Sequence, residues 1–167
     1  ADRRAVPGEW RWAHFFMAGF EPRALANGCS QIEVDAIGTA NLAGLQAESA
    51  ASGLSFREVL VVFLTAFENT LSFEGASQPV QDAYNGAFSA FITAFDQVKA
   101  AGGTNQEAED AGDDAYTSYL QTNHPLLFDA EKYGWYSIDA MTDNPTPSSS
   151  WEVESALENA VLWVTLA

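Results

Sequence analysis

The sequence predicts an all-α fold, a bundle of about five to seven helices, and three observations support this prediction. Ser or Thr stands three residues before Glu at four places, which is the capping-box pattern of helix N-termini. Gly or a His-Pro pair falls between these starts, where helices commonly end. Between these signals, apolar residues recur at helical spacing. The four capping boxes span residues 30–33, 55–58, 104–107 and 149–152.

The chain has 167 residues, of which 47% are hydrophobic, so it is long enough to bury a core of its own. We expect one domain made of three parts. Residues 1–20 form an aromatic, locally basic arm or helix, and residues 21–123 form an acidic helical core. Residues 124–167 form a tail that packs on this core or projects from it.

The first predicted helix covers about residues 7–20 and is strongly aromatic. Arg11 and His14 fall opposite its aromatic face, on the polar side of the helix, and we interpret His14 as structural or solvated. A second helix, at about residues 31–52, carries alanines at helical spacing, which lets a neighbouring helix approach closely. The broad face of the first helix comprises Trp10, Trp12, Phe16, Met17 and Phe20.

The third predicted helix, at about residues 56–72, contains the most apolar run of the chain. This run is nine residues long, at 59–67, and it is bounded by Glu58 and Glu68. A membrane span needs about 20 apolar residues. We therefore predict no membrane span here and expect this helix to be buried at the centre of the bundle.

Two further helices are expected at about residues 79–99 and 105–121, and the first of them is cleanly amphipathic. Residues 124–141 fit either a short helix followed by an irregular aromatic segment, or a small hairpin around Gly134. A Pro- and Ser-rich linker then precedes a last predicted helix at 151–165.

The net charge of −16 is unevenly distributed along the chain. Residues 1–25 hold four bases and three acids, whereas residues 26–167 hold three bases and 20 acids. Such a surface repels nucleic acid and anionic membranes and attracts basic partners or cations. We therefore expect no direct contact with nucleic acid. The expected partner is another copy of the chain, a neighbouring assembly protein or a basic protein.

Residues 104–116 contain five carboxylates and no cation, and on a helix these form two stripes. The stripes are Glu107, Asp110 and Asp114, and Glu109 with Asp113. A cation site, a mimic of nucleic-acid phosphates and a solvated helix face are the three interpretations. No calcium-loop pattern is present, and acids near a helix N-terminus are favoured by the helix dipole. We favour a solvated acidic face, comprising Glu107, Asp110, Asp113 and Asp114, with the phosphate mimic as the alternative.

No residue pattern predicts catalysis, a cofactor or a metal site. The two histidines, His14 and His124, belong to no metal-binding motif. Cys29 has no neighbouring His or cluster of cations that would favour a thiolate. Nucleophile-elbow, P-loop and dinucleotide-binding patterns are absent from the sequence. We therefore predict a protein that is not an enzyme and that has no catalytic, metal or cofactor residues.

Aromatic residues gather on residues 1–20, which hold five of the 21 aromatics in the one part of the chain that is not acidic. An aromatic face flanked by arginine is typical of a docking element, although such a helix equally covers its own core. Two more apolar residues fall on the polar side of the last predicted helix. The predicted interface residues are Trp10, Trp12, Phe16, Phe20, Trp151 and Leu162.

The favoured function is a structural or assembly subunit, such as a virion, head–tail or filament component, whose N-terminal arm lies on the acidic body of the next copy. The first alternative is an acidic mimic of nucleic acid that inhibits a basic DNA-binding protein. The second alternative is a helical bundle that binds a small ligand in an aromatic pocket. The residues that would line this pocket, or simply fill the core, are Tyr84, Phe88, Phe91, Phe95 and Tyr119.

Overall fold

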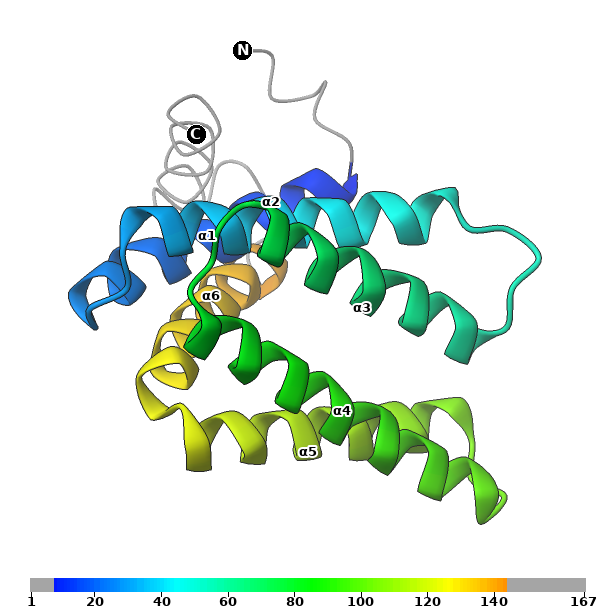
Figure 1. The fold of residues 1–167 in the computed structure, drawn as a ribbon. Helices are drawn as coiled ribbons and strands as arrows, with labels where there is room; N and C mark the ends of the chain where they lie inside the picture. Colours follow the sequence, from blue (N-terminus) through cyan, green and yellow to red (C-terminus); the bar gives the residue numbers. More distant parts are fainter. Residues whose placement is uncertain (1–7, 144–167) are drawn as a thin grey trace.

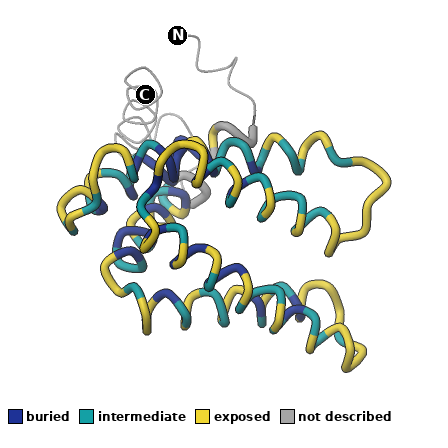
Figure 2. The backbone as a smooth tube through the Cα atoms, in the orientation of Figure 1, coloured by how far each residue is buried: buried dark blue, intermediate teal, exposed yellow. Residues whose placement is uncertain are grey.

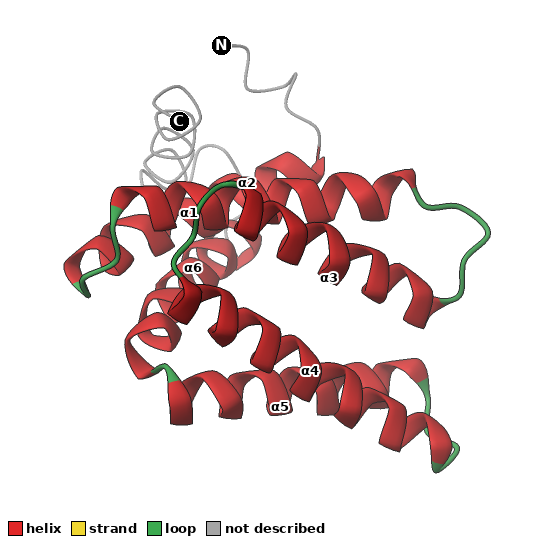
Figure 3. Ribbon diagram, in the orientation of Figure 1, coloured by secondary structure: helices red, strands yellow, loops and turns green. Residues whose placement is uncertain are grey.

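The computed structural model describes residues 8–143, which form six helices joined by short connections (Figure 3). The predicted all-α fold is confirmed, and no strand occurs within residues 8–143. The predicted helix at 151–165 lies outside the described residues. In chain order the helices are α1 (Gly8–Ala26), α2 (Gln31–Ala50), α3 (Phe56–Phe73), α4 (Gln78–Ala100), α5 (Asn105–Asn123) and α6 (Pro125–Asp143).

Three of the four predicted capping boxes begin helices as expected. Ser30 Oγ accepts a hydrogen bond from the backbone N–H of Glu33 at 3.1 Å, and Ser55 and Thr104 act in the same way at the starts of α3 and α5. Each of these bonds satisfies a backbone donor that has no partner inside its helix. The fourth box, at 149–152, lies outside the described residues.

The helices pack as three antiparallel pairs: α1 with α6, α2 with α3, and α4 with α5 (Figure 1). In the α1–α6 pair, the rings of Phe16 and Trp135 lie 5.5 Å apart and Arg23 Nε forms an ion pair with Asp129 Oδ2 at 2.6 Å. The other two pairs are hairpins of consecutive helices. In Figure 1 the α2–α3 hairpin lies above the α4–α5 hairpin.

The core lies toward one end of the bundle. Buried residues concentrate where α1 and α6 meet the first halves of α2 and α4, whereas the far ends of both hairpins are exposed (Figure 2). The large side chains that are almost fully buried are Met17, Phe20, Val34, Ile37, Phe67, Leu71, Tyr84, Phe95 and Leu120.

α3 is not the central helix that its apolar sequence predicts. Only Phe67 and Leu71 of α3 are buried, and Phe73 at its end is 87% exposed. α3 packs along α2 but makes much less contact with α4. The hydrophobicity of a helix predicts that it will be covered, but it does not specify how many neighbours will cover it.

The predicted end of the first helix is wrong, and its predicted polar side is only partly exposed. α1 continues past Phe20 to Ala26 and contains Pro22. On that side Arg11 is exposed, whereas His14 is buried, as its structural interpretation requires, because α1 packs against both α6 and α2. Burial lowers the pKa of the His14 imidazole.

Residues 125–143 form one continuous helix, so neither the irregular segment nor the hairpin around Gly134 is present. A Cβ atom at Gly134 would lie 2.5 Å from the ring of Phe16. The glycine therefore lets α6 approach α1 closely while remaining helical. As a consequence, the segment predicted as a tail packs against the segment predicted as an arm.

Candidate functional site

A cavity of about 460 Å³ lies between the helices, and all six helices contribute to its wall. This volume falls within the range of about 300–1,000 Å³ that is typical of small-molecule sites. Most of the wall is apolar. The apolar lining residues are Ala13, Phe16, Leu45, Leu60, Phe63, Leu64, Phe67, Phe88, Phe91, Trp135 and Ile138.

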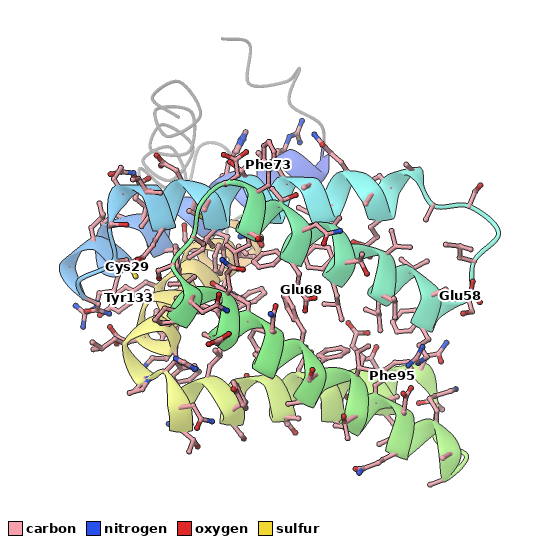
Figure 4. The ribbon with its side chains drawn as sticks, in the orientation of Figure 1. Cys29, Glu58, Glu68, Phe73, Phe95 and Tyr133 are labelled. Atoms are coloured by element: carbon pink, nitrogen blue, oxygen red, sulfur yellow. The ribbon has the colours of Figure 1, made fainter. Side chains whose placement is uncertain are left out.

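The cavity exists because α3 and α4 meet at two places and lie apart between them. Near their connection, Phe67 of α3 packs on Tyr84 and Phe88 of α4, with ring centroids 4.9 and 5.1 Å away. At the outer end, Phe56 stacks on Phe95 at 5.9 Å, and Figure 4 shows Phe95 on the side of α4 that faces α3. Both contacts are made by large rings on both helices, which keep the two backbones apart.

A polar group lies in the depth of this apolar cavity. Glu131 of α6 is only 5% exposed, and one of its oxygens accepts a hydrogen bond from Tyr116 Oη of α5 at 2.8 Å. Burial raises the pKa of Glu131 to about 7, and the hydroxyl groups of Tyr116 and Tyr84 partly oppose this rise. Glu131 is thus a carboxyl group that is partly protonated near neutral pH.

The hydroxyl group of Tyr84 is the second polar feature of the deep cavity. Tyr84 is 2% exposed, and its Oη atom is buried without a hydrogen-bond partner. It lowers the pKa of Glu131 as a nearby hydroxyl donor does, but the two groups do not meet the geometry of a hydrogen bond, so Tyr84 Oη has no partner. A buried polar group in this state costs about 1–3 kcal/mol of stability.

Three further carboxylates line the cavity nearer to solvent, Glu48 on α2 and Glu109 and Asp113 on α5. Burial and the nearby charges of Glu109, Asp110 and Asp114 raise the pKa of Asp113 to about 6. Burial and the charge of Glu109 also raise the pKa of Glu48. Asp113 keeps much of its own surface exposed. We therefore place these three groups at the mouth of the cavity and call them the mouth carboxylates.

One face of α5 connects the mouth to the deep polar group. Glu109, Asp113 and Tyr116 follow one another at intervals of four and three residues, which places them on one side of a helix. At 1.5 Å per residue this polar track is about 10 Å long. It ends at the Tyr116 hydroxyl, which donates to Glu131.

The predicted acidic face is divided by the structure. Glu107, Asp110 and Asp114 are exposed and lie outside the cavity wall. Asp113, and Glu109 from the same stripe, line the cavity. Part of the acidic stretch is therefore a solvated helix face, and part of it belongs to the cavity.

Only three of the five aromatic residues considered for a ligand pocket line the cavity. Tyr84, Phe88 and Phe91 line the cavity, whereas Phe95 packs one helical turn further out against Phe56. Tyr119 lies over Gly86 on the other side of α4, outside the cavity wall.

Of the six predicted interface residues, the structure describes the side chains of Phe16 and Phe20. Phe16 and Phe20 are buried in the core, where their rings stack with centroids 5.2 Å apart. The structure does not describe the side chains of Trp10 and Trp12. Trp151 and Leu162 lie outside the described residues. For Phe16 and Phe20, the first helix covers its own core.

Sequence reasoning missed Glu131, Tyr116 and Glu48, although one signal was present for Glu131. Glu131 lies four residues after Leu127 and seven before Ile138, so it falls on the same face of α6 as these two buried apolar residues. A carboxylate on an apolar stripe indicates a functional or hydrogen-bonded acid. That signal becomes visible only when residues 125–143 are assigned to one helix.

Within residues 8–143, no group of three or more His, Cys, Asp or Glu side chains is arranged to hold a metal ion. No helix in this part of the chain is sufficiently long and apolar to cross a bilayer. No family model matches the chain, and no curated protein or solved structure is significantly similar to it. The cavity is therefore the feature from which a function can be inferred.

Proposed function

We propose that this protein binds a small, largely apolar molecule in the cavity between its six helices. The observation that carries this proposal is an apolar cavity of about 460 Å³ that contains a buried, unpartnered hydroxyl group, that of Tyr84, beside the buried Glu131. A ligand with one polar group would satisfy this hydroxyl and fill the apolar space around it.

The apolar wall can supply useful affinity. A molecule that buries about 200 Å² of apolar surface gains roughly 5 kcal/mol at 25 cal/mol per Å². Entropic costs of association reduce this gain, whereas polar contacts add to it. Because 5 kcal/mol alone corresponds to a dissociation constant of about 0.2 mM, we expect submillimolar dissociation constants for molecules that fit and whose polar contacts offset the entropic cost.

The other two predicted functions have less support from the described residues. The assembly function relied partly on Phe16 and Phe20, and both are buried inside one copy of the chain. The phosphate-mimic function needs a row of outward carboxylates, and only the stripe of Glu107, Asp110 and Asp114 remains for it, because the other two acids of the stretch line the cavity. Both functions stay predictions, which light scattering and binding to a basic protein would test.

A neutral fluorescent probe, N-phenyl-1-naphthylamine, tests the proposal on the full chain. We expect saturable binding to one site, with enhanced fluorescence. Replacing Leu60 and Leu64 together by Trp narrows the cavity and should weaken probe binding at least tenfold, because both leucines line its wall.

The matched control replaces Val61 and Thr65 together by Trp. These two residues lie on α3 beside the leucines, but they are exposed and do not line the cavity. The control should bind the probe as the native chain does. Absence of saturable binding, or equal loss in both double variants, would refute the proposal.

A further inference from the structure

We infer that the molecule bound in the cavity is a protonated primary or secondary amine with an apolar body. This inference rests on the function proposed above. The wall contains four carboxyl groups, and among the described residues it contains no Lys, Arg or His. A cavity whose only ionisable groups are acids and tyrosines favours a cation over an anion. The four acids are Glu48, Glu109, Asp113 and Glu131.

Three basic side chains of the described residues form ion pairs away from this wall. Arg23 and Lys132 pair with Asp129, and Arg57 pairs with Asp96. At the mouth, by contrast, burial and neighbouring negative charges raise the pKa values of two carboxyl groups. The negative field of these mouth carboxylates extends along the track of about 10 Å to the deep cavity and favours a cation there.

The deep cavity offers two acceptors for the N–H groups of an ammonium. Glu131 already accepts from Tyr116, and a carboxylate has about four lone-pair sites, so it can accept further bonds. Tyr84 Oη is the second acceptor, because it is buried with no partner. A primary or secondary ammonium has at least two N–H donors and can serve both acceptors. An alcohol has one donor, and a quaternary ammonium has none.

The rings around these acceptors also suit a cation. Phe67 packs on Tyr84 and Phe88 with ring centroids 4.9 and 5.1 Å away, and Phe88 packs on Tyr116 at 5.6 Å. Aromatic faces attract cations through their quadrupole, most strongly where water is excluded. The deep end of the cavity thus combines aromatic rings, a carboxyl group and a free hydroxyl acceptor.

Three molecules with one apolar body and different head groups test the inference: 4-phenylbutylamine, 4-phenyl-1-butanol and 4-phenylbutyrate. We expect calorimetry at 150 mM salt and pH 7.5 to show the amine binding at least tenfold tighter than the alcohol, and the carboxylate binding more weakly than both. The alcohol binding as tightly as the amine would overturn the inference while leaving the proposed function intact. If N-phenyl-1-naphthylamine and all three molecules fail to bind, both proposals are wrong.

A strongly acidic chain attracts any cation, so a matched pair of variants separates the cavity from the general field. Glu109→Gln with Asp113→Asn removes two mouth charges, whereas Asp110→Asn with Asp114→Asn removes two exposed charges from the same helix. We expect the first pair to weaken amine binding at least fivefold and the second to change it less than twofold. Equal weakening by the two pairs would overturn the inference, because the preference would then come from net charge alone.

Discussion

The α1–α6 pair and the α3–α4 contact show two ways in which helices of this protein meet. In the first, Gly19 faces the backbone of Tyr133 and Gly134 faces the ring of Phe16, so the helices approach closely. In the second, rings meet rings, as in the contact of Phe67 with Tyr84, and α3 contains no glycine. Glycine lets α1 and α6 pack without a gap, and we call this a sealed contact. Rings on both sides keep α3 and α4 apart and leave space that a ligand can use, and we call this an open contact.

The largest expected effect comes from breaking the sealed contact with Gly19→Ala. The new Cβ would collide with the backbone carbonyl of Tyr133, which cannot move without displacing α6. We expect the free energy of unfolding, measured with urea, to fall by about 3 kcal/mol, even though Ala favours a helix more than Gly does. Gly86→Ala is the control, since its Cβ would meet the end of the Tyr119 side chain, which can rotate away. Equal losses in the two variants would contradict this explanation.

The second effect concerns pH and Glu131 of α6, the buried acid of the cavity beside the open contact. The pKa of Glu131 is about 7 in the folded protein, against an ordinary value of 4.5. Between these values the folded state binds more protons than the unfolded state, so stability falls as pH rises from about 4.5 to 7. Tyr84 and Tyr116, which face this group, have pKa values raised well above the ordinary value of 10 by burial and stay protonated in this range.

A difference of this size corresponds to about 3 kcal/mol for Glu131. Urea unfolding at pH 5 and pH 7.5 measures it. Glu131→Gln should remove most of the decrease and be more stable than the native chain at pH 7.5. A smaller decrease of the same sign should remain, because the pKa of Asp113 is also raised, to about 6. An unchanged pH dependence in Glu131→Gln would show that another group is responsible.

The sequence predicted the limits of the helices in the open α3–α4 contact better than those of the helices in the sealed α1–α6 pair. The limits of α2 to α5 were predicted to within two residues, because caps such as Ser30 and stops such as Gly75 act on the nearest turn of helix. The position of α3 was not predicted, because its apolar run does not specify which helix will cover it. The cavity was not predicted either, since its wall combines side chains from six helices and its deep acid, Glu131, lies in a segment whose helical state was left open.

The third effect is smaller and has opposite signs in two neighbouring tyrosines. Tyr84→Phe removes a buried hydroxyl that lacks a partner, so we expect unfolding to become harder by about 1 kcal/mol. Tyr116→Phe removes the donor to Glu131, so it should destabilise the protein by a similar amount. Thermal unfolding of both variants measures this contrast. If both variants are destabilised, the Tyr84 hydroxyl has a partner after all.

The smallest effect is expected at the outer end of the open contact, where Arg57 and Asp96 join α3 to α4. The Arg57 guanidinium donates two hydrogen bonds to the Asp96 carboxylate, at 2.7 and 2.9 Å, and about half of each side chain is exposed. Exposed ion pairs contribute little to stability because water and salt screen them. Arg57→Ala should therefore shift the urea midpoint less than any variant above, and the shift should diminish in 1 M NaCl. Because the adjacent Phe56–Phe95 stack remains, the affinity for N-phenyl-1-naphthylamine should stay unchanged. A marked loss of probe affinity in Arg57→Ala would instead show that the ion pair, rather than the rings, keeps the outer end of the cavity closed.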